Sequence, residues 1–164
     1  ERARRARDAG AELVLAAVHA GTELRTAPSA QQVEVVAALT ASGAFDFVYG
    51  HHAHVPQPWA RVNGVPVMYG AGNLVAQMKV ATPQAYESML GRLTFEERAD
   101  GWEVVRAEYV PLLMTLGTTG SPARVLPVNA ALAAGTGDTA RLELARDRVR
   151  RAATSLGADG LVEA

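Results

Sequence analysis

Two mostly apolar runs, separated by a helical pattern, constrain the fold of this chain most strongly. The first run is Leu13 to Val18 (LVLAAV), and the second is Phe45 to Tyr49 (FDFVY). The first run has no polar alternation, which is typical of strands that are buried on both faces of a parallel sheet. A strand, a helix and a second strand within about 40 residues predict a βαβ unit with a right-handed crossover.

The segment between the runs carries its own start and stop signals for a helix. Ser29 and Gln32 have the spacing of a capping box, in which each side chain bonds the free backbone N–H of the other. Gly43 is placed to end the helix. The expected buried face consists of Val33, Val36, Ala37 and Thr40.

All four histidines of the chain follow these two runs. His19 comes directly after the first run, and His51, His52 and His54 follow the second in the stretch GHHAHVP. Parallel neighbouring strands have their carboxyl ends at the same edge of a sheet, where α/β proteins tend to bind ligands. We therefore expect the histidines to lie close together although they are distant in sequence.

Imidazole is the commonest side-chain metal ligand near neutral pH. His52 and His54 are two residues apart, so an extended loop can turn both rings toward one point, and His19 would supply a third ring. Three nitrogen ligands suit zinc, manganese or iron, whereas magnesium and calcium prefer oxygen. The competing interpretation is that each histidine is a surface or hydrogen-bonded residue in a plain α/β domain.

Three further residues have more than one interpretation. His51 would support a metal ligand, or contact a substrate phosphate or leaving group. Glu23, four residues after His19, would orient a histidine, contact substrate or be solvated. Asn73, in the loop GAGN, would bind a phosphate oxygen or fix the loop.

The rest of the chain predicts antiparallel structure and a final helix. Asn63-Gly64 is the preferred pair for a two-residue hairpin turn between short strands. Residues 86–96 and 102–110 predict two more antiparallel strands, and residues 111–127 an irregular extended segment. Asp138 would cap a helix over residues 139–156, with a buried stripe of Leu142, Ala145, Val149, Ala152 and Leu156.

Composition excludes some classes of function for this chain. The 164 residues suit a single domain, the formal net charge is -1 and cysteine is absent. A nearly neutral chain without interleaved basic and aromatic residues is not expected to bind nucleic acid, and thiolate metal sites are excluded. The first ten residues predict the end of a helix, with neither an initiator Met nor an apolar signal core, so we expect a longer protein upstream.

Three segments resemble one known family. They are VHAGTE (18–23), GHHAHVPQP (50–58) and MYGAGNLV (68–75). In this order and spacing they are similar to the CapA-type poly-γ-glutamate capsule biosynthesis proteins, which resemble the calcineurin-like metallophosphoesterase superfamily. The resemblance covers residues 12–115. Ala20, Ala53, Gly70 and Leu74 depart from residues common in the family, but none of these departures removes a candidate ligand.

The resemblance implies a fold and a ligand set. The fold would be an α/β chain of the metallophosphoesterase sandwich type, with residues 1–164 as one N-terminally truncated domain that forms the C-terminal half of a larger fold and ends in a helix at 138–157. His19 and His52 would share one metal ion, and His54 would bind a second. The superfamily's upstream ligands, including a bridging carboxylate, are not found, so we expect this chain alone to bind metal weakly and to have little hydrolase activity.

The resemblance also implies a function. It would be a metal-dependent phosphoesterase-like protein with two divalent ions (Mn, Fe or Zn), with His51 and Glu23 as catalytic groups and Asn73 in contact with substrate. Its partners would be an anionic polymer such as poly-γ-glutamate or a phosphoester substrate, together with membrane synthase or export proteins, in the bacterial cell envelope or outside the cell. The alternative is a non-catalytic accessory protein that binds polymer or partner during capsule assembly.

Overall fold

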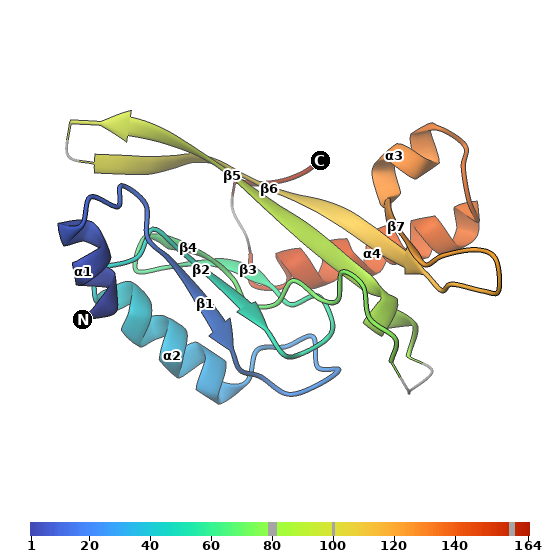
Figure 1. The fold of residues 1–164 in the computed structure, drawn as a ribbon, viewed down its shortest axis with the longest axis horizontal. Helices are drawn as coiled ribbons and strands as arrows, with labels where there is room; N and C mark the ends of the chain where they lie inside the picture. Colours follow the sequence, from blue (N-terminus) through green and yellow to red (C-terminus); the bar gives the residue numbers. More distant parts are fainter. Residues whose placement is uncertain (79–81, 100, 158–159) are drawn as a thin grey trace.

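Two four-stranded sheets face each other in the part of the chain that the structure describes. The computed structural model describes residues 1–78, 82–99, 101–157 and 160–164. The first sheet has the strand order β1-β2-β4-β3, and the second has β5-β6-β7 with β8 paired to β6. Figure 1 shows α2 on the side of the first sheet that faces away from β5 and β6. The predicted α/β class is confirmed.

The predicted βαβ unit is present. After α1 (Arg2–Asp8), β1 (Leu15–His19) leads through α2 (Ala30–Ala41) to β2 (Phe47–His51), and the two strands pair in parallel. The capping box is formed as expected: the Ser29 N–H donates to Oε1 of Gln32 at 3.0 Å, and the Gln32 N–H donates to Oγ of Ser29 at 3.2 Å. The apolar runs therefore predicted the two strands, and the capping box predicted the start of the helix between them.

The hairpin around Asn63-Gly64 completes the first sheet. It joins β3 (Trp59–Val62) to β4 (Val65–Met68), which pair antiparallel, and β4 also lies parallel to β2. Asn63 and Gly64 have φ of 49° and 81°. Positive φ at both central residues is what a type I′ turn requires, and this explains the choice of residues.

The second sheet is built from a long hairpin. A 3₁₀ turn (Pro83–Tyr86) leads into β5 (Glu87–Arg98), which pairs antiparallel with β6 (Gly101–Thr115). The prediction for residues 111–127 was wrong at both ends, because 111–115 continue β6 and β7 (Arg124–Pro127) pairs with it. The helix α3 (Val128–Ala133) and β8 (Leu161–Glu163) were not predicted.

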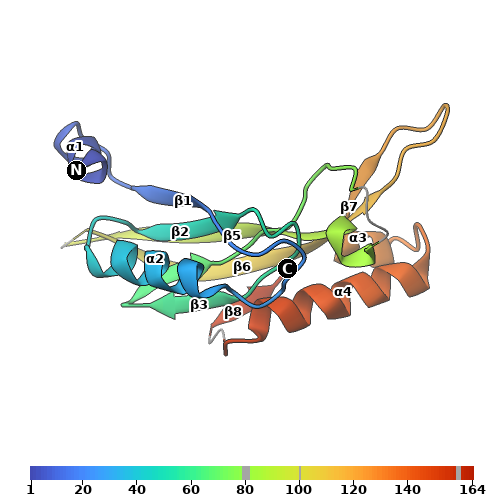
Figure 2. The same ribbon diagram turned by 90° about the horizontal axis from the view of Figure 1, so that it is seen from below.

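The core between the sheets also receives the last helix. Phe47, Trp59 and Met68 from the first sheet form one buried cluster with residues of β5, β6 and α4 (Thr139–Thr154), namely Met89, Tyr109, Val149 and Ala153. Figure 2 shows α4 running alongside the sheets on the β3 and β8 side. No helix in the described ranges is long and apolar enough to cross a membrane.

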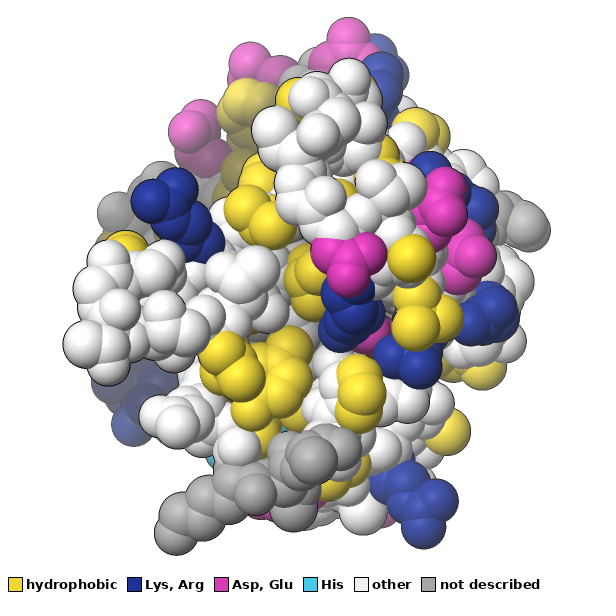
Figure 3. All heavy atoms as spheres, turned by 90° about the vertical axis from the view of Figure 1, so that its right-hand side faces the viewer, with side chains coloured by type: hydrophobic (Ala, Val, Ile, Leu, Met, Phe, Trp, Pro, Cys, Tyr) yellow, Lys and Arg dark blue, Asp and Glu magenta, His cyan; other side chains and the backbone are white. Residues whose placement is uncertain are grey.

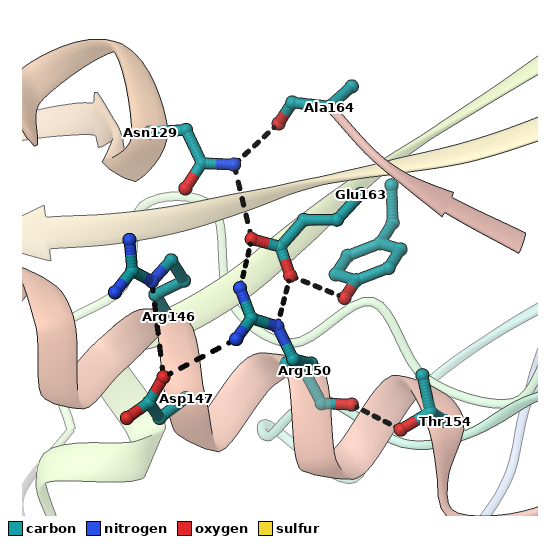
Figure 4. A network of polar contacts seen from close by, with 8 residues as sticks. Asn129, Arg146, Asp147, Arg150, Thr154, Glu163 and Ala164 are labelled. Atoms are coloured by element: carbon teal, nitrogen blue, oxygen red, sulfur yellow. Dashed lines mark hydrogen bonds and ion pairs between the residues drawn. The ribbon is translucent and has the colours of Figure 1, made fainter. Parts of the chain in front are cut away.

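Ion pairs and hydrogen bonds attach the last strand to α4. Arg150 binds the Glu163 carboxylate through two nitrogens at 2.7 and 2.9 Å, and Tyr109 and Asn129 donate to the same carboxylate (Figure 4). Burial opposes the charge on Glu163, but the hydrogen bonds from Arg150, Tyr109 and Asn129 outweigh it, so the pKa of Glu163 is lowered. The C-terminal strand is therefore fixed to both β6 and α4.

Three expectations about burial were wrong. Leu15 in β1 is 50% exposed, because the core between the sheets draws its residues from β2, β3 and β4 and not from β1. Val33 and Leu156 are also exposed. On α2 the side chain of Gln32 is buried in place of that of Val33, and it contacts Gln57 in the loop that follows the histidines.

Charge is dispersed on the face formed by the α3 end of the molecule. In Figure 3 acidic and basic side chains lie next to one another there, beside gathered hydrophobic side chains. The buried carboxylate of Glu87, whose side chain is 1% exposed, is also paired with arginines, Arg141 at 2.6 Å and Arg148 at 3.1 Å. This face therefore carries no broad field of one sign.

Candidate metal centre

The carboxyl ends of β1 and β2 bring the histidines together, as the topology predicted. His19 and His51 are Cα partners in the parallel register. The ring centroids of His19 and His52 lie 4.9 Å apart, and those of His52 and His54 lie 6.4 Å apart. All four histidines line one cavity of about 150 Å³, together with Ala53, Val55, Gly70, Gly72 and Asn73.

The histidine loop takes an unusual backbone path. His52 and His54 have φ of 95° and 60°, a region that residues with a side chain seldom adopt. Such strain persists only where the surrounding structure enforces it, and it is concentrated at functional sites. Here the backbone of the preceding loop holds the turn, because the Leu24 N–H donates to the carbonyl oxygen of Ala53 at 2.7 Å.

Gly50 is required by the close approach of the next loop. A Cβ atom at this position would overlap the carbonyl oxygen of Tyr69. The carbonyl oxygen of Gly50 in turn accepts from the Ala71 N–H at 3.2 Å. Tyr69 is buried, and burial raises the pKa of its hydroxyl above 10.0, so this group stays neutral. The histidine loop and the glycine-rich loop are thus packed backbone to backbone.

A pair of buried glutamines lies beneath these loops, and sequence reasoning missed its role. Gln32 Nε2 donates to Oε1 of Gln57 at 2.7 Å and to the carbonyl oxygen of Tyr69 at 3.1 Å. Gln57 Nε2 donates to the carbonyl oxygens of Arg25 and Ala27 at 3.0 and 3.3 Å. One amide pair therefore connects the loops after β1, β2 and β4. A polar residue between Pro56 and Pro58 was the available signal.

Asn73 lies against His54. Its Oδ1 is 2.7 Å from Nδ1 of His54, and its Nδ2 donates to the carbonyl oxygen of Ala85 at 3.0 Å and to that of His54 at 3.4 Å. The side chain is 9% exposed. Both of its polar atoms already have protein partners, which is the geometry of a residue that fixes a loop. Its contact with substrate stays a prediction.

The two predicted catalytic groups lie in different places. His51 is exposed, lines the cavity and meets the Tyr49 ring edge-on at a centroid distance of 5.5 Å. Glu23 is exposed and is not among the residues that line the cavity. The structure therefore places His51 beside the other histidines and leaves Glu23 outside this group.

The spacing of the rings can be compared with that of imidazoles bound to a metal ion. Two imidazoles that each bind one zinc ion at about 2 Å would have ring centroids about 4.5–5.2 Å apart, for angles at the ion between about 90° and the tetrahedral value. The His19–His52 distance of 4.9 Å falls in this range, and the His52–His54 distance of 6.4 Å exceeds it. Within the described ranges, no three His, Asp or Glu side chains are arranged to hold one ion. The ring spacing of His19 and His52 is therefore compatible with two ligands of one ion, and the described residues add no third ligand.

The sequence of this region matches a known family. Residues 1–78, which include every candidate site residue, match the family described as bacterial capsule synthesis protein PGA_cap. The PGA_cap match contains the whole first sheet and the loops that carry the histidines, so it covers the site and not the second sheet.

A curated relative agrees with the PGA_cap match. The chain is 35% identical over 65 residues to the PGA biosynthesis protein CapA of Bacillus subtilis (strain 168). The aligned part is 40% of this chain and 17% of that protein. The resemblance to CapA-type capsule proteins inferred from the three sequence segments is therefore confirmed.

Proposed function

We propose that this chain carries part of a divalent-metal site in a CapA-type, phosphoesterase-like protein of capsule synthesis. The ions would be Mn, Fe or Zn, and the protein would act on an anionic envelope polymer such as poly-γ-glutamate or on a phosphoester linked to its synthesis or export. The observation that carries the proposal is the 4.9 Å separation of the His19 and His52 rings, on strand ends that the fold places side by side.

The roles of the residues follow from where they lie. His19 and His52 would bind one ion, and His54, at the longer ring distance, would bind a second ion. His51 is exposed at the same cavity, and it would donate a proton to a leaving group or bind a phosphate oxygen. A bound ion would supply Lewis acidity and would lower the pKa of a water ligand.

The alternative is an accessory protein that binds polymer or a membrane synthase or export partner without catalysis. Both readings place the protein in the cell envelope or outside the cell, since capsule synthesis is an envelope process. They differ in whether a phosphoester is cleaved.

Cobalt titration of the chain tests the metal site. We expect Co²⁺ to produce weak visible absorption bands in the wild-type protein, and His52→Ala to weaken binding by more than the roughly 10–100-fold typical of residues that only support a ligand. His51→Ala is the matched control, because the imidazole of His51 is adjacent to His52 in sequence but is not assigned to an ion, and this variant should retain the wild-type affinity. Unchanged Co²⁺ affinity in His52→Ala would remove the metal assignment.

Activity separates the two readings. The protein loaded with Mn²⁺ or Zn²⁺ would be assayed with a chromogenic phosphodiester, and its binding to polyglutamate would be measured in parallel. Turnover that is lost in His51→Ala and His54→Ala supports the phosphoesterase reading. Polyglutamate binding without turnover supports the accessory reading.

A further inference from the structure

Asn73 and His54 form a contact whose chemistry can be assigned in full. Two polar atoms of Asn73 face three partners: Oδ1 faces Nδ1 of His54 at 2.7 Å, and Nδ2 faces the carbonyl oxygens of Ala85 and His54. Carbonyl oxygens accept hydrogen bonds and cannot donate them. The amide group that faces them must therefore be the NH₂ end, and the oxygen must face the imidazole.

This orientation of Asn73 fixes the tautomer of His54. An amide oxygen only accepts, so Nδ1 of His54 must carry the hydrogen. In the neutral imidazole, the other nitrogen, Nε2, then holds the lone pair. The fold thus selects one of two tautomers that are otherwise close in energy, and it does so with an amide that is buried and held by two backbone oxygens.

We propose that Asn73 is a positioning residue for His54, which fixes the Nδ1–H tautomer and keeps the Nε2 lone pair available as a ligand in the cavity that His54 lines. The same contact holds the ring against rotation, because both Asn73 atoms are anchored. The consequence for metal binding rests on the proposed function, whereas the tautomer itself does not.

The backbone conformation of the two loops accompanies this contact. His54 has φ of 60°, a region that residues with a side chain seldom adopt. Gly72, which precedes Asn73, has φ of 80°, and a Cβ there would press against the backbone of Glu87 and Ser88. The glycine lets the Asn73 loop approach β5 closely enough for Nδ2 to reach the Ala85 carbonyl.

Nitrogen NMR of the metal-free chain tests the tautomer directly. The chain would be labelled with ¹⁵N-histidine and recorded at about pH 8.5, roughly two units above the usual histidine pKa, where imidazole is neutral. We expect the His54 pattern to show a protonated Nδ1 and an unprotonated Nε2. A pattern with the hydrogen on Nε2 overturns the proposal without any mutation.

Variants then test whether Asn73 is the cause. Asn73→Ala should convert His54 wholly or largely to the Nε2–H tautomer or to a mixture. Asn129→Ala is the control, because it removes the side-chain hydrogen bonds of another asparagine, to Glu163 and Ala164, and does so away from the histidines. It should leave the His54 pattern unchanged. If Asn73→Ala keeps the Nδ1–H pattern, Asn73 does not set the tautomer.

Co²⁺ titration of the same variants separates this proposal from the proposed function. Asn73→Ala should lower Co²⁺ affinity roughly 10–100-fold, while Asn129→Ala should not. A wild-type chain that shows the Nδ1–H tautomer but binds no Co²⁺ would contradict the metal site and support the positioning role. Unchanged Co²⁺ affinity in Asn73→Ala would contradict the part of the inference that concerns metal.

Discussion

At the scale of single residues, the backbone path of the histidine loop depends on a few positions, one of which must lack a side chain. Gly50 allows the carbonyl oxygen of Tyr69 to lie against the histidine loop, and His52 and His54 hold positive φ. Each of these features, the close backbone approach and the positive φ angles, would lower the stability of the folded chain if nothing compensated for it. They persist because hydrogen bonds between the loops enforce them, which is typical of functional sites.

Replacing Gly50 by alanine should therefore destabilise the chain by steric overlap alone. We expect a loss of about 1–3 kcal/mol or more in the free energy of unfolding, because the new methyl would meet a backbone atom that cannot move aside. Gly120→Ala is the control: its φ is 85° and its surroundings are open, so only backbone strain of about 1–2 kcal/mol applies. Urea denaturation measures both. A smaller loss for Gly50→Ala than for Gly120→Ala would contradict the packing described.

At the scale of elements, buried amides join loops that are separate in sequence. Gln32 begins α2 as part of its cap and also reaches Gln57 and the Tyr69 carbonyl. Because both glutamines are at most 2% exposed, each lost partner would leave a buried polar group without a hydrogen bond. The start of the helix and the site loops are therefore one structural unit.

Gln57→Leu should lower the free energy of unfolding by about 1–3 kcal/mol for each buried partner left without a hydrogen bond. Gln32→Ala should also lower the free energy of unfolding. The double variant should lose less stability than the sum of the two single variants, because both single variants remove the same hydrogen bond between Gln32 and Gln57. Gln31→Ala, exposed on the same helix, is the matched control and should change stability little. Strict additivity in urea denaturation would show that the two glutamines act independently.

Local signals predicted most of these elements, and distant pairing explains the rest. The capping box at Ser29, the Asn63-Gly64 turn and the Asp138 cap each depend on residues a few positions apart, and all three are present. In contrast, β8 exists because it pairs with residues 107–109, more than 50 positions earlier. The histidine cluster was predictable from parallel strands, but the partners of Gln57 and Asn73 were not, since they come from separate loops.

At the scale of the whole molecule, carboxylates paired with arginines hold the second sheet together. Glu108 is 3% exposed and binds Arg92 at 2.7 and 2.8 Å and Arg106 at 2.7 Å. The hydrogen bond from Arg92 is the main cause that lowers the pKa of Glu108 from 4.5 to about 2; burial opposes it, and Arg106 adds to it. The molecule should therefore be sensitive to acid.

This pKa sets the direction of the pH dependence. Between pH 4.5 and about 2 the unfolded chain binds a proton at this position that the folded chain does not, so stability is present above 4.5 and is lost as pH falls toward 2. Glu163, whose pKa is also lowered, adds to the same trend. Urea midpoints across this range should fall with pH in the wild type and fall less steeply in Glu108→Gln. An equally steep fall of the urea midpoint in Glu108→Gln would exclude Glu108 as a cause of the pH dependence.

The register between β1 and β2 has a consequence for how this region tolerates insertions and deletions. His19 and His51 stand opposite each other only because five successive residues of the two strands are matched. Since side chains alternate between faces, adding or deleting one residue within β1 would turn His19 to the far side of the sheet while leaving the sequence motif intact. Strand length is thus as essential to this centre as the imidazoles themselves.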